Sequence, residues 1–521
     1  MTLAGKARIG AGVKNGNGRQ LPTQSSLNGA IKSIADIMRR SNCAGALQYV
    51  PELTWLLFLR ILDERETREA DEAEAVSADF TPSLKAPYRW KDWAAPEGKK
   101  RTKLTGDGST IGDVFAFVNG DLLPYLRKLK DRPGATPRQK VISEIMSSVE
   151  RTRIDTEKNF LDVLDKVNEI SSDNVDTTHI FPLSQIYEGL LLKMGEKGND
   201  GGQFFTPREV IRAMIRVVEP NVGETVYDPG CGTGGFLAQS FEFMREKLGA
   251  KATASQLETL KRRTFYGREK DNLIYPIALA NLVLHEIDEP HIWHGNTLTG
   301  AENYGGLYTD APSTFDVVLM NPPFGGKEGK EAQTRFAYKT GATQVLFLQH
   351  VIDSLKPGGR CGIVLDEGVL FRNIEMAFVQ TKRKLLDDCD VQCIISLPGG
   401  VFTAAGAGVK TNLIFFTKGK PTQKIWYYDL SDVKVGKTRP FTLDKFDDFF
   451  KLWPKRGDSD RSWTITRKQI EEKNFDLKAV NPNAKADDDT RTPEQLLDLI
   501  EAKGQEVAEA VAELRRLQGK Q

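Results

Sequence analysis

The tetrapeptide Asn321-Pro322-Pro323-Phe324 has the residue types needed to hold a planar amine and present it for group transfer. The exocyclic amine of a nucleic-acid base is a poor nucleophile because its lone pair is delocalised into the ring. Two acceptors, the Asn321 side-chain oxygen and the Pro322 carbonyl, can hold both amine hydrogens, while the prolines fix the backbone so that these acceptors converge. A base can stack on Phe324, a contact worth ~1–3 kcal/mol. We predict that Asn321, Pro322, Pro323 and Phe324 are catalytic.

A glycine-rich turn lies about ninety residues upstream, within Val226-Tyr-Asp-Pro-Gly-Cys-Gly-Thr-Gly-Gly-Phe236. Glycine lets the backbone approach a ligand closely, and the N-terminus of the following helix supplies free N–H groups. The turn also fits the dinucleotide fingerprint, but that fingerprint needs an acidic residue ~20 residues further on, whereas the next predicted strand ends only at Glu269. Asp228 would repel a pyrophosphate and attract the cationic methionine part of S-adenosylmethionine. The charges therefore favour the methyl donor.

Together, the two motifs resemble those of amino-group DNA methyltransferases that modify adenine at N6. More narrowly, four further segments are similar to the modification subunit of type I restriction–modification systems: Tyr187–Leu191, Gly202–Val210, Gly368–Phe371 and Leu397–Phe402. The resemblance covers essentially the whole chain. It implies an α/β fold, with a Rossmann-like class I methyltransferase sheet, an α-helical N-terminal domain and a C-terminal helix. It also implies S-adenosyl-L-methionine as the methyl donor and a flipped adenine of double-stranded DNA as the acceptor.

The resemblance assigns roles to the residues around the cofactor. The segment Gln203–Arg208 is similar to the one that closes over the methionine end, Thr233–Gly235 to the turn beneath it, and Glu269 to the ribose acceptor. Asn296 stands where such enzymes often carry an aspartate near the adenine ring, and an amide can still hydrogen-bond there. For the two phenylalanines of the closing segment, core packing remains an alternative. The predicted cofactor-binding residues are Gln203, Phe204, Phe205, Thr206, Pro207, Arg208, Asp228, Gly230, Thr233, Gly234, Gly235, Glu269, Asn296 and Asn321.

The charge balance and the length of the chain indicate that another protein reads the DNA sequence. The chain has 72 Lys and Arg against 71 Asp and Glu, a net charge of +1, without the basic excess typical of a protein that holds DNA by phosphate neutralisation alone. After the last predicted core strand only about a hundred residues remain, which is short for a base-reading domain. We therefore predict a separate DNA-specificity subunit. The resemblance implies the same, with two copies of this chain per specificity subunit, and leaves open whether a restriction endonuclease subunit joins them.

The sequence pattern divides the chain into four parts: a disordered tail over 1–26, a helical N-terminal domain over 27–192, a methyltransferase domain over 193–480, and a linker with a partner-docking helix over 481–521. The run Pro51–Asp63 is apolar enough to be the buried centre of the helical domain. From residue 225 onward, β-branched runs alternate with helical stretches, which predicts a parallel sheet with helices on both faces. Ligands of such a sheet bind at the carboxyl ends of its strands, where both motifs lie. The predicted strands are Thr225–Asp228, Thr264–Glu269, Phe315–Asn321, Arg360–Asp366, Val391–Leu397 and Thr411–Thr417.

Three segments each leave two interpretations open. Ten Lys and Arg residues between Lys99 and Lys140 form either a patch with which the helical domain clamps DNA, or an ordinary solvated face. The polar stretch Gly325–Gly341 is either a loop that orders when DNA binds or a disordered surface loop. The C-terminal helix opens with the capping box Thr492–Gln495 and continues with near-heptad apolar spacing. It docks either on a partner chain or on its own domain.

The composition argues against several other classes of protein. No stretch approaches the ~20 consecutive apolar residues that span a bilayer, and the basic N-terminus lacks the apolar core of a secretory signal, so we predict a cytoplasmic protein without a membrane partner. Five cysteines, mostly inside apolar runs, indicate reduced thiols and no metal site. Two alternative functions remain: a methyltransferase acting on a protein glutamine or an RNA amine, and a scaffold that has kept the fold without turnover.

Overall fold

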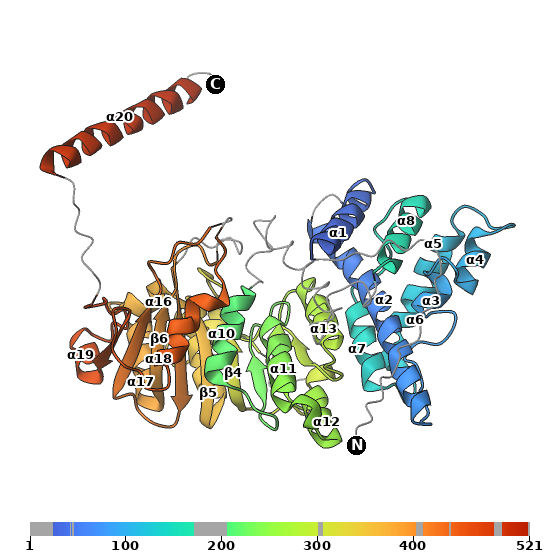
Figure 1. The fold of residues 1–521 in the computed structure, drawn as a ribbon, viewed down its shortest axis with the longest axis horizontal. Coiled ribbons are helices and arrows are strands. Elements are labelled where there is room, and N and C mark those ends of the chain that lie inside the picture. The colour runs from blue at the N-terminus through green and yellow to red at the C-terminus, as the bar shows by residue number, and fades with distance from the viewer. Residues whose placement is uncertain are drawn as a thin grey trace, which may run out of the picture.

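The computed structural model describes residues 24–41, 43, 46–170, 206–300, 306–402, 410–436, 439–483 and 492–518. These residues form a helical N-terminal unit, a sheet covered by helices, and a separate C-terminal helix (Figure 1). Most of the predicted tail lies outside the described residues. So do three of the predicted cofactor-binding residues, Gln203, Phe204 and Phe205.

The N-terminal unit is built around one long helix, α2 (Ala46–Ala75). Its residues from Leu53 to Leu59 are at most 3% exposed, which confirms the predicted buried centre. Trp55 of this helix has the rings of Trp93 and Phe160 around it, with centroids 6.4 and 6.5 Å away. Large aromatic rings thus join α2 to its neighbours. The other helical elements are α1 (Gln24–Arg39), α3 (Trp90–Trp93), α4 (Lys99–Thr105), α5 (Asp113–Phe117), η1 (Val118–Leu122), α6 (Leu123–Arg127), η2 (Leu129–Asp131), α7 (Pro137–Met146) and α8 (Glu157–Asn168).

A nine-stranded sheet lies within the described part of the second unit, in the order β3-β2-β1-β4-β5-β7-β6-β8-β9. All the strands predicted from the sequence are present, but the sheet is mostly rather than wholly parallel, because β7 runs antiparallel to β5 and β6, and β9 to β8. Only 13 residues lie between Leu397 and Thr411, close to the minimum of about a dozen that a parallel crossover needs. The strands are β1 (Val226–Asp228), β2 (Phe265–Glu269), β3 (His291–His294), β4 (Phe315–Met320), β5 (Leu355–Asp366), β6 (Cys389–Ser396), β7 (Thr411–Lys418), β8 (Lys424–Asp429) and β9 (Ser462–Thr466).

Each face of the sheet carries its own apolar core. Along β4, Val317 and Leu319 pack with residues of α10 and α11, while Val318 and Met320 pack with residues of α15 and α17. Because successive side chains of a strand point to opposite faces, this alternation buries both faces and leaves the strand ends for ligands. The helices of this unit are α10 (Arg208–Val218), α11 (Gly235–Leu248), α12 (Ala254–Arg262), α13 (Ile274–Leu284), α14 (Lys330–Gln333), α15 (Thr343–Ser354), α16 (Glu367–Phe371), α17 (Met376–Asp388), α18 (Asp447–Leu452) and α19 (Arg467–Glu472), with 3-10 turns at Gly249–Lys251, Gly306–Tyr308 and Leu443–Phe446.

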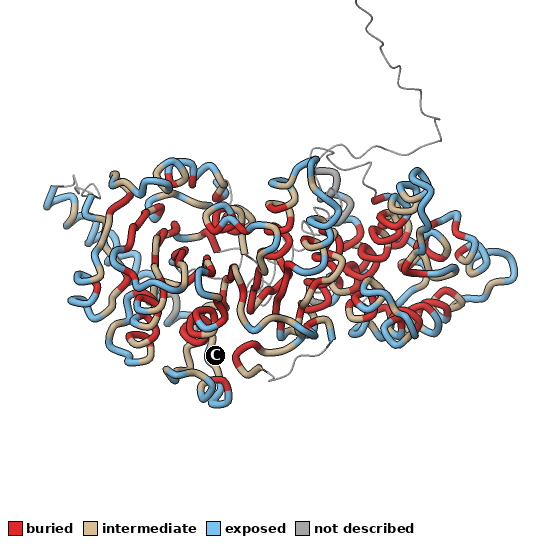
Figure 2. Tube along the Cα trace, turned by 90° about the horizontal axis from the view of Figure 1, so that it is seen from below, coloured by how far each residue is buried: buried red, intermediate tan, exposed pale blue. Residues whose placement is uncertain are grey.

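Helix α13 joins the sheet to the helical unit. All of its residues are buried, and a helix that is apolar all round must be covered on every side. It contacts α11 beside the sheet and both α2 and α7 of the helical unit. Buried segments accordingly continue from the sheet into the helical unit (Figure 2). The sheet unit and the helical unit therefore pack against each other through an apolar interface around α13.

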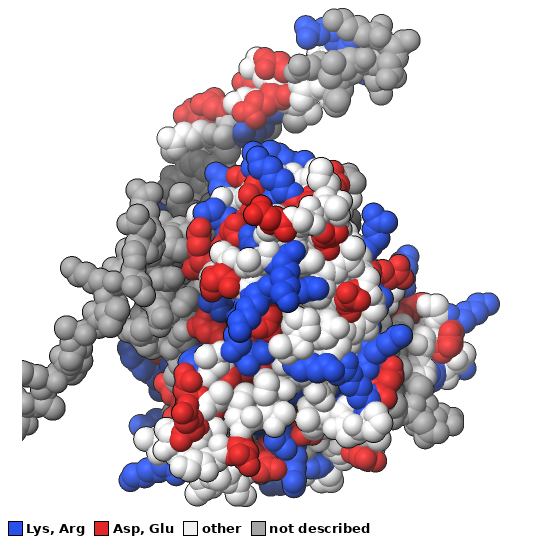
Figure 3. Space-filling view, turned by 90° about the vertical axis from the view of Figure 1, so that its right-hand side faces the viewer, with Lys and Arg blue, Asp and Glu red and all other residues white. Residues whose placement is uncertain are grey.

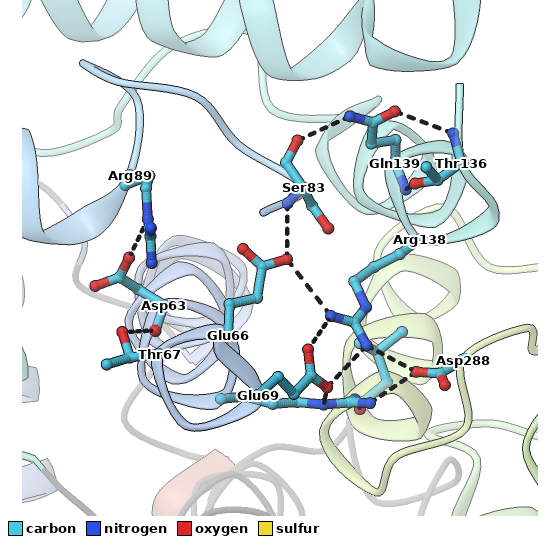
Figure 4. Close-up of polar contacts among 12 residues, drawn as sticks. Asp63, Glu66, Thr67, Glu69, Ser83, Arg89, Thr136, Arg138, Gln139 and Asp288 are labelled. Atoms are coloured by element: carbon cyan, nitrogen blue, oxygen red, sulfur yellow. Dashed lines mark hydrogen bonds and ion pairs between the residues drawn. The ribbon is translucent and has the colours of Figure 1, made fainter. Parts of the chain in front are cut away.

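A group of ion pairs, here called the interdomain cluster (Arg65, Glu69, Arg138 and Asp288), crosses the same contact. Glu69, Arg138 and Asp288 are labelled in Figure 4. Arg65 Nη2 and Arg138 Nη2 both donate to Asp288 Oδ1, at 2.7 and 3.1 Å, and Arg138 Nη1 donates to Glu69 Oε2 at 2.6 Å. Burial alone would raise the pKa of Asp288, but the charges of Arg65 and Arg138 outweigh it and hold that pKa below its usual value. The carboxylate of the methyltransferase unit is thus held ionised by two arginines of the helical unit.

We expect Asp288→Ala to lower the free energy of unfolding by about 2–3 kcal/mol, because two largely buried guanidinium groups lose one of the two carboxylates that they share and keep the other, that of Glu69. Asp432→Ala removes an exposed pair with Arg461 and serves as the control, with an expected effect below about 1 kcal/mol.

The effect of Asp288→Ala on the stability of the protein should depend on pH. The folded pKa of Asp288 is lowered, so its stabilisation is present above its unfolded pKa of about 4 and is lost as the pH falls through the folded pKa. Scanning calorimetry should therefore show a gap in Tm between wild type and Asp288→Ala that closes below about pH 4. A gap of equal size at about pH 7 and about pH 3 would contradict this account.

The basic residues between Lys99 and Lys140 are partly structural. Arg101 is 8% exposed and pairs with Asp165, while Arg138 belongs to the interdomain cluster. Figure 3 shows the end of the molecule formed by the helical unit, where basic and acidic side chains lie interspersed. The structure therefore favours an ordinary solvated face over a continuous DNA-facing patch.

Helix α20 (Pro493–Gln518) stands apart from the rest of the described protein (Figure 1). It begins at the predicted capping box, in which Thr492 N–H donates to Gln495 Oε1 and Gln495 N–H to Thr492 Oγ1, at 2.9 and 3.2 Å. Five of its described apolar residues are 39–67% exposed and do not pack on the described part of the protein: Leu497, Leu499, Ile500, Val507 and Val511. None of the helices in the described ranges combines the length and the apolar character needed to cross a bilayer.

Candidate active site

A cavity of about 320 Å³ lies where the two sequence motifs meet, at the carboxyl ends of β1, β2 and β4 and beside the turn after β3. It brings together eleven of the predicted site residues: Thr206, Arg208, Asp228, Gly230, Thr233, Gly235, Glu269, Asn296, Asn321, Pro323 and Phe324. Pro207, Gly234 and the buried Pro322 do not line it. The topology thus places the glycine turn and the tetrapeptide on neighbouring strands, as their positions at strand ends predict.

The glycine turn has little room for side chains. A Cβ at Gly230 would lie 3.0 Å from Met320 Cε, and one at Gly235 would lie 3.1 Å from Ile211 Cδ1. Gly234 has φ +80°, which favours glycine, and a Cβ there would lie 3.3 Å from the Leu282 side chain. Gly234 therefore serves the packing of α11 on α13, while Gly230 and Gly235 keep the cavity wall close to the backbone.

Two buried carboxyl groups, Asp228 and Glu269, line the cavity at the ends of β1 and β2. Asp228 Oδ1 accepts from Gly230 N–H at 3.1 Å, and Glu269 accepts from the N–H groups of Gly232 and Asp271 at 2.9 and 2.8 Å. Burial, with the nearby charge of Glu269, raises the pKa of Asp228 to about 8. Burial likewise raises the pKa of Glu269 to about 7. The cavity therefore places two carboxyl groups where a cation or a hydroxyl would stabilise their ionised forms.

The Asn321 amide is held in one orientation with one acceptor unused. Its Nδ2 donates to Thr206 Oγ1 at 3.0 Å, across 115 residues of sequence. Its Oδ1 is buried and has no hydrogen-bond partner. A buried acceptor without a donor is unfavourable unless a ligand supplies one. The site is therefore arranged to accept a hydrogen at this oxygen.

The ring of Phe324 borders the same cavity. Phe402, from the segment that follows β6, packs against it edge to face, with centroids 5.6 Å apart and planes at 74°. This contact supports the ring from one side. The segment that ends at Phe402 therefore contacts the tetrapeptide directly in the folded protein.

The loop over Gly325–Gly341 is folded and forms a wall of the cavity, rather than the disordered loop that was one of its two interpretations. Its ends are joined by a hydrogen bond from Glu328 N–H to the Gly341 carbonyl at 2.9 Å, and Gln333 Nε2 donates to the Glu328 carbonyl at 2.8 Å. Lys327 and Glu328 line the cavity. These contacts hold the loop in place within the protein itself.

Asn296 lines the cavity with its acceptor already engaged. Its Oδ1 accepts from Leu298 N–H at 2.9 Å in a local turn. An aspartate would offer further acceptors, whereas this amide keeps its Nδ2 donor for a ligand. The departure from the family pattern thus changes the kind of hydrogen bond that this position can make.

Comparison with known proteins shows the family. The N-6 DNA Methylase family model matches residues 178–490, and the HsdM N-terminal domain model matches residues 27–167. The chain is 33% identical to the type I restriction enzyme EcoEI methylase subunit of Escherichia coli, over 95% of this chain and 98% of that one. The chain belongs to the methylase subunits of type I restriction–modification systems.

Solved structures agree with this family assignment. A modification subunit assigned to a type I restriction enzyme of Vibrio vulnificus has a TM-score of 0.76 and 32% identity, over 89% of this chain and 98% of that one. A chain from a study of type I restriction–modification assembly has a TM-score of 0.70 and 36% identity, over 96% of this chain and 99% of that one. The activity of the methylase subunit is methylation of adenine in DNA at N6, so the protein-glutamine and RNA-amine alternatives are set aside.

Sequence reasoning did not identify several residues that line the cavity of this methylase subunit. Ile211 and Phe347 form apolar walls, and their helices have no local feature that distinguishes them from core positions. Asp271 did carry a signal, because an acid just before a helical run is a capping residue. Its Oδ1 accepts from the N–H groups of Leu273 and Ile274 at the start of α13.

We expect Thr206→Val to lower the single-turnover methylation rate by about fivefold, since a lost hydrogen bond of ~1 kcal/mol would let the Asn321 amide rotate. Thr206→Ser keeps the hydroxyl and should retain most of the rate. Both variants should bind DNA as the wild type does. If serine and valine reduced the rate equally, Thr206 would act through packing instead of orienting Asn321.

Proposed function

We propose that this methylase subunit binds S-adenosyl-L-methionine in the cavity and methylates N6 of an adenine extruded from double-stranded DNA. The observation that carries the proposal is the buried Asn321 Oδ1, which has no donor, while Thr206 orients its amide. The exocyclic amine of a flipped adenine can supply the missing donor. When bound, the cofactor supplies a methyl group made electrophilic by a sulfonium.

The charged residues of the cavity fit such a cofactor. Asp228 would face its cationic part, and Glu269 can accept from ribose hydroxyls while keeping its backbone hydrogen bonds, since each carboxylate oxygen has two lone pairs. Burial and the charge of Arg212 lower the pKa of Arg208, which lines the cavity, so an anionic group there would stabilise its guanidinium. The carboxylate at the methionine end is such a group.

The tetrapeptide then acts on the base. Asn321 Oδ1 accepts one hydrogen of the amine and the Pro322 carbonyl accepts the other, which favours a tetrahedral nitrogen. Phe324, supported by Phe402, stacks on the adenine ring. No side chain needs to remove a proton before the transfer, because the amine can lose it to water afterwards.

We further propose that a DNA-specificity subunit reads the sequence, with two copies of this chain bound to each. The net charge of +1 supports the assignment of sequence reading to another protein. Residues 481–521 would be the linker and docking helix, because the apolar residues of α20 are exposed. Since the substrate is cellular DNA, we place the protein in the cytoplasm.

Co-expression with a DNA-specificity subunit of the same restriction–modification system, in a host without N6-adenine methylation, tests the proposal. Single-molecule sequencing should find modified adenines in one split, two-part DNA motif, and none when either chain is expressed alone. Unmodified DNA in the presence of both intact chains would contradict it. Methylation by this chain alone would contradict only the role of the specificity subunit.

A further inference from the structure

Three exposed apolar side chains lie close together in sequence after β5, and we call them the apolar tip (Phe371, Ile374 and Met376). They are 47%, 92% and 69% exposed. Water-exposed groups of this kind, gathered within six residues, mark a contact surface more often than a scattered apolar residue does. Among the described residues, Ile111 is also a fully exposed isoleucine, but no other exposed large apolar residue lies near it in its loop.

The apolar tip rises from the same edge of the sheet as the active site. Strand β5 lies beside β4, with Ile363 opposite Met320, and continues for three more residues to Asp366. At ~3.3 Å per residue, Asp366, which directly precedes α16, lies roughly 10 Å beyond the level of Met320. Asp366 N–H donates to the side chain of Gln344, the neighbour of the cavity residue Thr343.

A buried lysine holds the base of the apolar tip. Lys382 is 1% exposed, and its ammonium donates to the carbonyls of Leu370 and Arg372 at 2.7 and 2.8 Å. The Leu370 carbonyl also accepts from Leu477 N–H at 3.1 Å. Burying an ammonium is unfavourable, and here its hydrogen bonds fix the backbone on both sides of Phe371. The exposed side chains thus stand on a backbone fixed by hydrogen bonds.

We propose that the apolar tip inserts into the DNA duplex beside the target adenine and stabilises the extruded state of that base. Apolar side chains that enter between base steps unstack them, and a rigid support lets them do so without being displaced. A single aromatic stack on Phe324 offsets only part of the free energy needed to extrude a paired base. Arg372, next to Phe371, has a half-exposed guanidinium paired with Glu375 at 3.4 Å, and a phosphate of the backbone could replace that exposed carboxylate. The proposal rests on base extrusion in the proposed function.

The test compares Ile374→Ser with Ile111→Ser, the same substitution at a fully exposed isoleucine of the helical unit. Both are made in the full chain assembled with its specificity subunit. Single-turnover methylation is measured on a duplex with a paired target adenine and on one with an abasic site opposite that adenine. Fluorescence of 2-aminopurine at the target position reports extrusion directly.

We expect Ile374→Ser to lose roughly tenfold in rate on the paired duplex, in line with losing the burial of one isoleucine side chain, and to show a smaller fluorescence increase. On the abasic duplex its rate should return to within about twofold of wild type, because the target is already unpaired. Ile111→Ser should match wild type on both.

Two results would contradict the proposal that the apolar tip inserts into DNA: an equal rate loss of Ile374→Ser on both duplexes, or no rate loss on either. Failure of Ile374→Ser to assemble on gel filtration would also overturn it, since the apolar tip would then dock the specificity subunit. An inactive wild-type complex on both duplexes would instead refute the proposed function itself.

Discussion

Replacing Asn321 by alanine should lower the single-turnover methylation rate by about 10²–10³-fold while leaving the Kd for S-adenosylmethionine within about threefold of wild type. The substitution removes the buried Oδ1 acceptor, and losing one preorganised polar contact to the reacting group has an effect of this size. The charged contacts proposed for the cofactor do not involve this amide.

Asn321→Asp provides the matched control. A carboxylate still offers an acceptor, and the Thr206 hydroxyl, which now accepts from Nδ2, can donate to it instead. We therefore expect the aspartate variant to keep a rate within about tenfold of wild type. Rapid-quench assays on the assembled complex and isothermal titration calorimetry measure the two quantities. Equal losses for alanine and aspartate would show that Asn321 matters for packing and not as an acceptor.

Replacing Asp228 by asparagine should weaken S-adenosylmethionine binding by roughly 10²-fold, because a buried carboxylate beside a cation contributes strongly to its affinity. S-adenosylhomocysteine has no charge on sulfur, so its affinity should change by less than about threefold. Asparagine keeps the size of the side chain and an acceptor for Gly230 N–H. Equal weakening of both ligands would show that Asp228 supports the turn instead of recognising charge.

The pKa of Asp228 adds a pH dependence to this prediction. With a pKa of about 8 before ligand binding, its carboxyl group is largely protonated near pH 7, so binding a cation must release its proton. The affinity for S-adenosylmethionine should therefore rise by up to about tenfold per pH unit between about pH 6 and about pH 8. A pH dependence that the affinity for S-adenosylhomocysteine also shows reports Glu269, whose pKa is about 7. The difference in pH dependence between the two ligands then isolates the contribution of Asp228.

Stability without cofactor should have the opposite pH dependence. A carboxyl group whose pKa is raised on folding favours the folded state only while protonated, so its ionisation destabilises the protein as the pH rises from about 4 through about 8. Calorimetry should show wild-type Tm falling relative to Asp228→Asn over this range. Titrations at several pH values in two buffers of different ionisation enthalpy would detect the released proton. An affinity for S-adenosylmethionine that does not change with pH would contradict the assignment.

The location of the site could be predicted from the sequence because its determinants are local. The order of residues in Asn321–Phe324 and the glycines after Asp228 are set within a few positions, and each motif directly follows a recognisable strand. Parallel strands place their carboxyl ends at one edge, so the two motifs were expected to meet, and they do. The capping box of α20 and the buried centre of α2 were predictable for the same reason.

Contacts between distant segments were decided only by the tertiary structure. The hydrogen bond that orients Asn321 comes from Thr206, 115 residues away, and the arginines that hold Asp288 lie on two helices of the other unit. Whether a basic residue faces solvent or an internal carboxylate depends on which helices pack together. Residue spacing specifies what a short segment can do, whereas its partners follow from how the apolar faces of the whole chain are buried against one another.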